Sequence, residues 1–188
     1  MNTSDNLDPK PDSHFHQHRD KEYVTNYFPE IYGTVKNGPT CNIVISLVKF
    51  RRSNSTLGMY IDLRMNSYSV ERNKYFSSKK GITVPTKILL GVINALNSLP
   101  QNPPEDLPEV GNKIIAKFEK YKNIHLAVSV TNVHGEPKLD IREWVNDVLH
   151  SYEGFTYKGV RFSYDLIPQV SAVLMTIYDK ITPVDKSN

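Results

Sequence analysis

The sequence predicts an α+β protein made of two repeats, each a curved antiparallel β-sheet of about four strands followed by a C-terminal helix. Three observations support this fold class. Short motifs recur in the same order in both halves of the chain, apolar alternation precedes helical spacing in each half, and a proline-rich segment separates the halves. We expect the two repeats to pair within the chain as an intramolecular pseudo-dimer.

The repeat rests on two pairs of motifs at equal spacing. Ile61–Arg64 (Ile-Asp-Leu-Arg) matches Leu139–Arg142 (Leu-Asp-Ile-Arg), and Lys80-Gly-Ile matches Lys158-Gly-Val. Asp62 precedes Gly81 by 19 residues, and Asp140 precedes Gly159 by the same number. Matches that keep both order and spacing indicate an internal duplication.

Composition shifts divide the 188 residues into five segments. We predict a polar tail over 1–22, a first repeat over 23–99, a linker over 100–112, a second repeat over 113–182 and a polar end over 183–188. The linker is assigned because proline fits neither a helix interior nor a central strand, and Leu99–Pro108 contains four prolines.

Four strands are expected in each repeat. Apolar, β-branched runs predict buried strands at Asn42–Phe50 and Ile124–Val130, preceded by strands near Tyr23–Phe28 and Ile114–Tyr121. The third strands alternate, which predicts one dry and one wet face. The dry-face residues are Met59, Ile61, Leu63, Met65, Leu139 and Ile141, and the wet-face residues are Tyr60, Asp62, Arg64, Asn66, Lys138, Asp140, Arg142 and Trp144. Fourth strands should run into Gly81 and Gly159.

A helix is expected to close each repeat. Pro85 suits a first helical turn, and apolar residues recur at helical spacing from Ile88 to Leu99. Asp165 is a candidate N-cap for the second helix, whose apolar stripe runs from Leu166 to Ile181. Because that stripe is wide, we expect the two helices to pack on each other as well as on their own sheets.

Composition excludes several protein classes. Hydrophobic residues make up 39% of the chain, enough for a core, but no stretch is long and apolar enough to span a bilayer. The polar N-terminus argues against secretion, and the single cysteine, Cys41, cannot form an internal disulfide. His14, His16 and His18 could bind a metal, but we favour a polar tail there. We expect the protein to have no enzymatic activity and to bind no metal or cofactor.

Positive charge is concentrated in the first repeat. Residues 41–99 contain nine Lys and Arg against two Asp and Glu. Such an excess repels itself unless it meets an anion, so it suggests a phosphate-rich partner, although a solvated surface remains the alternative.

The motifs resemble those of the positive cofactor 4 family, above all Lys138–Trp144 and Ser78–Pro85. The resemblance covers about 41–99 and 113–181. Members are transcriptional coactivators that bind single-stranded DNA and are related in fold to the plant Whirly proteins. The simplest members carry one copy and dimerise through the terminal helix, so the resemblance implies that this chain builds the dimer within itself. Both copies depart from the pattern: the first has Asn66 and Ser67 where the second has Trp144, and the second has Tyr157 before Lys158 and is nearly neutral. We therefore expect the first copy to supply most phosphate contacts.

The candidate DNA-binding residues are of two kinds. Aromatic side chains can stack on unpaired bases, and cations can pair with phosphates. The candidate aromatic residues are Tyr60, Tyr68, Tyr75, Trp144 and Tyr157, each tyrosine having core packing as its alternative. The candidate cations are Lys49, Arg51, Arg52, Arg64, Lys74, Lys79, Lys80, Lys138, Arg142, Lys158 and Arg161. Lys49 and Arg51 share strand parity, residues 51–56 suggest a basic loop, and parity places Trp144 beside Arg142.

These features predict a largely sequence-independent single-stranded-DNA-binding protein that acts in transcription, as a coactivator, or in replication. Its expected compartment is the nucleus or a nucleic-acid-containing compartment of an infected cell. Expected partners are single-stranded or melted DNA, with RNA, RNA polymerase and general transcription factors as further candidates, and no membrane. The chain is expected to be a monomeric pseudo-dimer or a homodimer. The alternative is a protein-interaction module of a transcription complex that works through its helices.

Overall fold

The structure, a computed structural model, describes residues 24–52, 57–109, 111–147 and 151–182. The predicted tails, with His14, His16 and His18, and the centre of the basic loop at 53–56 lie outside the described residues.

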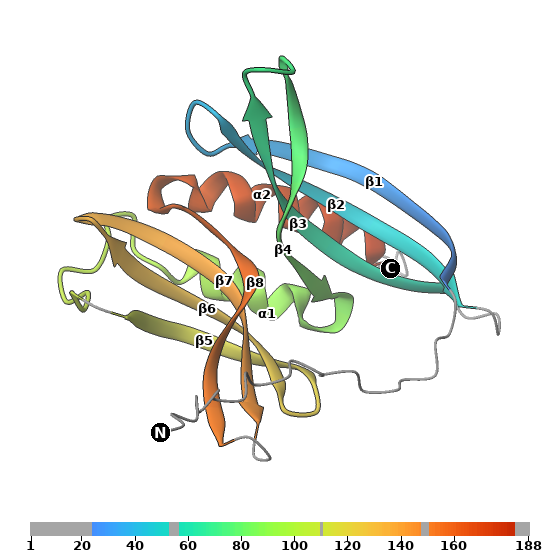
Figure 1. Cartoon of the computed structure of the whole chain (residues 1–188). Helices are drawn as coiled ribbons and strands as arrows, with labels where there is room; N and C mark the ends of the chain where they lie inside the picture. The colour runs from blue at the N-terminus through green and yellow to red at the C-terminus, as the bar shows by residue number, and fades with distance from the viewer. Residues whose placement is uncertain (1–23, 53–56, 110, 148–150, 183–188) are drawn as a thin grey trace, which may run out of the picture.

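Each half contains four strands and a helix, which confirms the predicted fold class (Figure 1). The first half comprises β1 (Val24–Lys36), β2 (Cys41–Arg52), β3 (Leu57–Ser69), β4 (Lys74–Pro85) and, after a 3-10 turn at Thr86–Ile88, α1 (Leu89–Asn97). The second comprises β5 (Asn112–Tyr121), β6 (Ile124–Val133), β7 (Glu136–Asp147), β8 (Tyr152–Ser163), a 3-10 turn at Tyr164–Leu166 and α2 (Ile167–Ile181). Both sheets are antiparallel meanders, ordered β1-β2-β3-β4 and β5-β6-β7-β8.

The dry faces of both sheets contribute to one core. Ile61 pairs with Leu47 and Leu63 with Ile45, and all four side chains are buried. Their counterparts on β7, including Leu139 and Ile141, belong to the same cluster. Met59 departs from the prediction: it is 36% exposed because β3 extends past the end of the core.

The helices are exchanged between the repeats. The main sheet contacts of α1 are with β5 and β6, and those of α2 are with β1 and β2. Gly91 on α1 leaves room for Phe118 of β5, and Gly33 on β1 leaves room for Val173 of α2. The helices also pack on each other, as predicted, but the expectation that each lies on its own sheet is wrong.

The same backbone conformation leads into both helices. Pro85 and Ser163 are extended, with φ −60° and −61° and ψ 141° at both residues, and a 3-10 turn follows each of them. Each chain segment thus leaves its sheet in the same direction and crosses to the other half. Among the described residues, no helix combines the length and hydropathy needed to cross a bilayer.

Between α1 and β5 the described residues form no helix or strand. The segment is nevertheless held against the body of the protein. Leu99 and Leu107 pack against the core, and the Tyr164 hydroxyl donates a hydrogen bond of 2.9 Å to the carbonyl of Pro100.

Candidate nucleic-acid interface

An aspartate–arginine pair lies on the wet face of each sheet. Arg64 Nη2 is 2.7 Å from Asp62 Oδ1, and Arg142 Nε is 3.0 Å from Asp140 Oδ1. Both aspartates are buried, so each one holds its arginine flat against the sheet. Each aspartate is therefore the ion-pair partner of the arginine two residues later in the chain.

The repeated glycines make room for these arginines. Gly81 is paired with Arg64 and Gly159 with Arg142 across the neighbouring strands. A Cβ atom at Gly81 would lie 2.7 Å from Arg64 Cζ, and one at Gly159 would lie 2.9 Å from Arg142 Cβ. The equal spacing of aspartate and glycine in the sequence therefore reflects one repeated packing arrangement.

A β-bulge precedes each glycine and alters which side chains face the solvent. In the first repeat the Ser78 hydroxyl accepts a hydrogen bond from the Lys80 amide at 3.1 Å, and in the second Thr156 accepts one from the Lys158 amide at 3.1 Å. The register shifts by two residues at both places. The bulge leaves Lys79 exposed in one repeat and Tyr157, 84% exposed, in the other.

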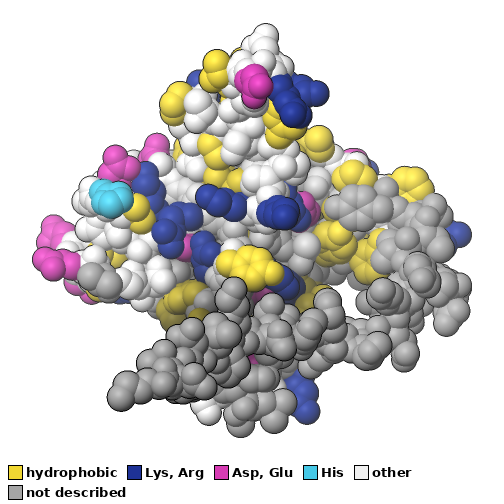
Figure 2. All heavy atoms as spheres, in the orientation of Figure 1, with side chains coloured by type: hydrophobic (Ala, Val, Ile, Leu, Met, Phe, Trp, Pro, Cys, Tyr) yellow, Lys and Arg dark blue, Asp and Glu magenta, His cyan; other side chains and the backbone are white. Residues whose placement is uncertain are grey.

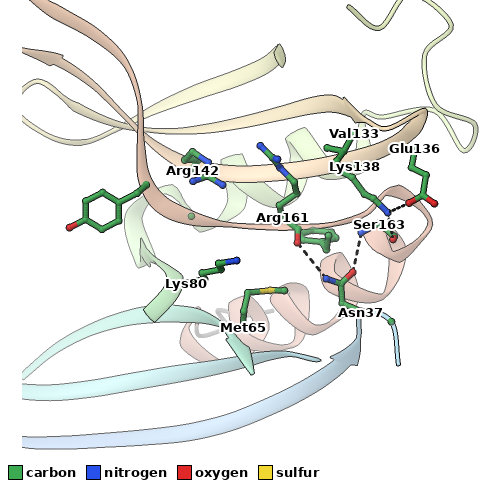
Figure 3. A pocket seen from close by; sticks show the side chains of 13 residues that line it. Asn37, Met65, Lys80, Val133, Glu136, Lys138, Arg142, Arg161 and Ser163 are labelled. Carbon is green, nitrogen blue, oxygen red and sulfur yellow. Dashed lines mark hydrogen bonds and ion pairs between the residues drawn. The ribbon is translucent and has the colours of Figure 1, made fainter. Parts of the chain in front are cut away.

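A cleft of about 610 Å³ lies between the two repeats. Figure 3 shows Lys80 on one side of it, facing Arg142, Arg161 and Lys138 on the other. Tyr157 also lines the cleft. The structure thus brings five of the predicted site residues together, from β4, β7 and β8.

The cleft carries an excess of positive charge. Arg142 and Arg161 share one carboxylate, that of Asp140, and Lys138 pairs with Glu136 at 2.6 Å. The Lys80 ammonium makes no ion pair with any residue that the structure describes. In Figure 2 the Lys and Arg side chains form a band across the middle of this face.

Most of the cations that line this cleft come from the second repeat, although the first repeat has the larger positive charge in the sequence. Lys138, Arg142 and Arg161 belong to it, and Lys80 belongs to the first. One substitution explains much of the difference: Asp62 has Thr83 as its cross-strand neighbour, whereas Asp140 has Arg161. Net charge along the sequence did not reveal which cations meet in space.

Asn37, which the sequence analysis did not single out, joins the repeats at one end of the cleft. Its side chain accepts a hydrogen bond from the Ser163 amide at 3.2 Å and donates one to the carbonyl of Arg161 at 3.4 Å (Figure 3). Nearby, burial raises the pKa of the Cys41 thiol, and the Lys80 charge and a hydrogen bond with Asn37 oppose that rise.

Lys49 and Arg51 lie on a different face from the cleft residues. They share parity, as predicted, but they pair with Met59 and Leu57, on the side of the sheet that carries the core. Arg64 pairs with Val44 and points to the opposite face, because alternate residues of a strand point in opposite directions. Arg52 ends β2, and its side chain lies outside the description.

The β3–β4 hairpin carries a second group of aromatic and basic residues. Tyr68 and Tyr75 are cross-strand neighbours with ring centroids 5.2 Å apart, and the Tyr68 hydroxyl donates to Asn73. Lys74 lies 4.9 Å from the ring centre of Phe76. Tyr60 lies at the other end of β3 from this hairpin and is half-buried against Phe50.

Trp144 lies on the predicted face but is not open to solvent. Its ring is 8% exposed, with the Lys117 ammonium 3.3 Å from its centre and His125 at its edge. The expectation of an exposed stacking surface is therefore wrong. The covering lysine comes from β5, whose pairing with β6 sets it over the ring.

Lys158 is tied to a buried ion pair. Lys120 and Glu143 are 2.8 Å apart and both buried, and Lys158 approaches the other oxygen of Glu143 at 3.5 Å. The charge of Lys158 is therefore partly neutralised by Glu143 and is not fully available to the cleft. Among the described residues, no group of three or more His, Cys, Asp or Glu could hold a metal ion.

No family model and no curated protein matches the chain. Two solved structures from Arabidopsis thaliana are similar: WHY3, at 10% identity and a TM-score of 0.38, over 80% of this chain and 87% of that one, and WHY1, at 9% and 0.36, over 80% and 89%. Both identities and both TM-scores are low.

Proposed function

We propose that this chain binds single-stranded DNA in the cleft between its repeats and acts on exposed strands in transcription or replication. The observation that carries the binding proposal is Tyr157, 84% exposed at a cleft lined by four cations. A solvent-exposed ring beside a positive groove is what an unpaired, charged strand requires. The motifs that resemble the positive cofactor 4 family support the role in transcription.

The side chains favour single strands over duplex DNA. Stacking on a tyrosine needs a base face that is free of its neighbours, and duplex bases do not offer one. The Tyr68–Tyr75 pair, with Lys74 beside it, offers a further contact along the β3–β4 hairpin. A strand that leaves the cleft past the bulge of β4 would reach this hairpin.

The alternative, an interaction module that works through its helices, receives less support. Five of the nine residues of α1 are buried, because the helix is covered by α2 and by the opposite sheet. Among the helical residues described, Leu90 is the one large hydrophobic side chain that is exposed. An apolar partner would find little helix surface to bind.

We predict that Lys80→Ala weakens binding of an oligothymidine about threefold to tenfold, because it removes a cleft cation that has no ion pair among the described residues. Fluorescence anisotropy measures the affinity, with matched duplex DNA as the comparison. The control is Lys87→Ala, which removes an exposed lysine of the 3-10 turn that does not line the cleft. Equal affinities for the two variants, or tighter binding of the duplex, would contradict the proposal.

A further inference from the structure

A second pocket, here called the linker pocket, lies where α1 ends and α2 begins. Its volume is about 670 Å³, which is within the ~300–1,000 Å³ usual for small-molecule sites. Apolar side chains form its walls: Leu96, Leu99, Pro100, Ile167 and Pro168. Polar side chains also line it: Asn97, Gln101, Asn102 and Asp165.

A third hollow borders both the linker pocket and the cationic cleft. This hollow is smaller, at about 450 Å³. It shares Glu136, Lys138 and Ser163 with the cleft, and Gln101, Asn102, Tyr164 and Asp165 with the linker pocket. A strand whose phosphates lie in the cleft therefore has a path along which a nucleotide can reach the pocket.

Apolar walls with a few polar groups suit a nucleobase, which has two flat faces and a polar edge. Two of the polar groups have a defined character. The side-chain oxygen Oδ1 of Asn97 accepts a 2.6 Å hydrogen bond from the Ser171 hydroxyl. The side-chain NH₂ group of Asn97 is left as a donor. Asp165 is exposed and makes no side-chain hydrogen bond with the described residues, so its carboxylate is an acceptor.

A donor together with a carboxylate matches guanine best. Guanine presents an acceptor oxygen beside two adjacent N–H donors on its pairing edge, and these two donors can bond both oxygens of a carboxylate. Adenine and cytosine each present one amino group there, and thymine presents one donor between two acceptors, which a carboxylate repels. We propose that the linker pocket receives a guanine base from a strand held in the cleft. The proposal rests on the proposed function and adds a base preference to it.

The test compares an oligothymidine with the same oligonucleotide carrying one central guanine, by anisotropy at fixed salt. We expect the guanine to tighten binding about fivefold, and Asp165→Asn to abolish this preference while preserving side-chain shape. The matched control is Asp179→Asn, which makes the same charge change at an exposed position of α2 outside the pocket and should retain the preference. Thermal melting verifies that both variants fold.

The outcomes separate the two proposals. If the oligothymidine binds with a steep salt dependence but guanine gives no advantage, or if Asp165→Asn keeps the advantage, the linker pocket is not a base site and the cleft still stands. If neither oligonucleotide binds, the proposed function fails and the pocket fails with it.

Discussion

At the scale of single residues, the same packing arrangement occurs at the repeated glycine of each half. Gly81 and Gly159 both face an arginine that is held by a buried aspartate. The atoms met by an added Cβ nevertheless differ. At Gly81 they are the far end of the Arg64 side chain, whereas at Gly159 they include Arg142 Cβ and the backbone oxygen of Ile141, both at 2.9 Å.

This difference predicts unequal costs for the same substitution. Gly159→Ala should lower the free energy of unfolding by about 1–3 kcal/mol, because neither backbone nor Cβ can move aside. Gly81→Ala should cost less, about 1 kcal/mol, because the obstructing atoms are the flexible end of the Arg64 side chain, which can shift slightly while it keeps its ion pair with Asp62. Urea denaturation of the two variants measures both values. Equal costs, or a larger cost at Gly81, would show that the arginines are not packed as described.

At the scale of strands and helices, each helix is held by the sheet of the other repeat. The contact of α2 with β1 is close at Gly33, where a Cβ would lie 2.7 Å from Val173 Cγ2. Glycine at this position, in the middle of a strand, thus has a packing reason, since a side chain there would push the helix away.

A double-mutant cycle tests this contact. Gly33→Ala alone should destabilise the protein by about 1–3 kcal/mol, because the new methyl group meets the rigid, branched Val173. Val173→Ala removes the obstructing methyl groups, so the double variant should be more stable than the sum of the single effects by at least ~1 kcal/mol. Additive effects would indicate that Gly33 and Val173 do not touch.

The sequence predicted where the strands and helices lie along the chain better than it predicted which of them pack together. Period-2 alternation indicates which face of a strand is dry, so Ile61 and Leu63 were placed correctly. It does not indicate which helix covers that face, because both helices have apolar stripes and both sheets accept them. The exchange of α1 and α2 was therefore not predictable from pattern alone.

The candidate site was predicted in part for a similar reason. Residue type identified Lys80, Arg142, Arg161 and Tyr157, which the structure brings to one cleft. Parity placed Trp144 on the correct face, but it could not show that Lys117, from another strand of the same sheet, covers the ring. Asn37 was missed because its role, bridging the repeats, depends on a contact between residues distant in sequence.

At the scale of the whole molecule, a pseudo-twofold arrangement of repeats carries an asymmetric charge distribution. The two halves share topology, bulges and aspartate–arginine pairs, but Arg161 in the second half has Thr83 as its counterpart. Lys80 enters the same cleft from the first half. The central claim is that one strand of DNA contacts both repeats at once.

The salt dependence of oligothymidine binding tests this claim most directly. On a plot of log affinity against log salt, each phosphate contact contributes about −0.7 for single strands. Lys80→Ala and Arg161→Ala should each reduce the slope by about that amount, and the double variant by about twice as much, with one oligonucleotide bound per chain. A slope that either variant leaves unchanged would contradict a strand bound across both repeats.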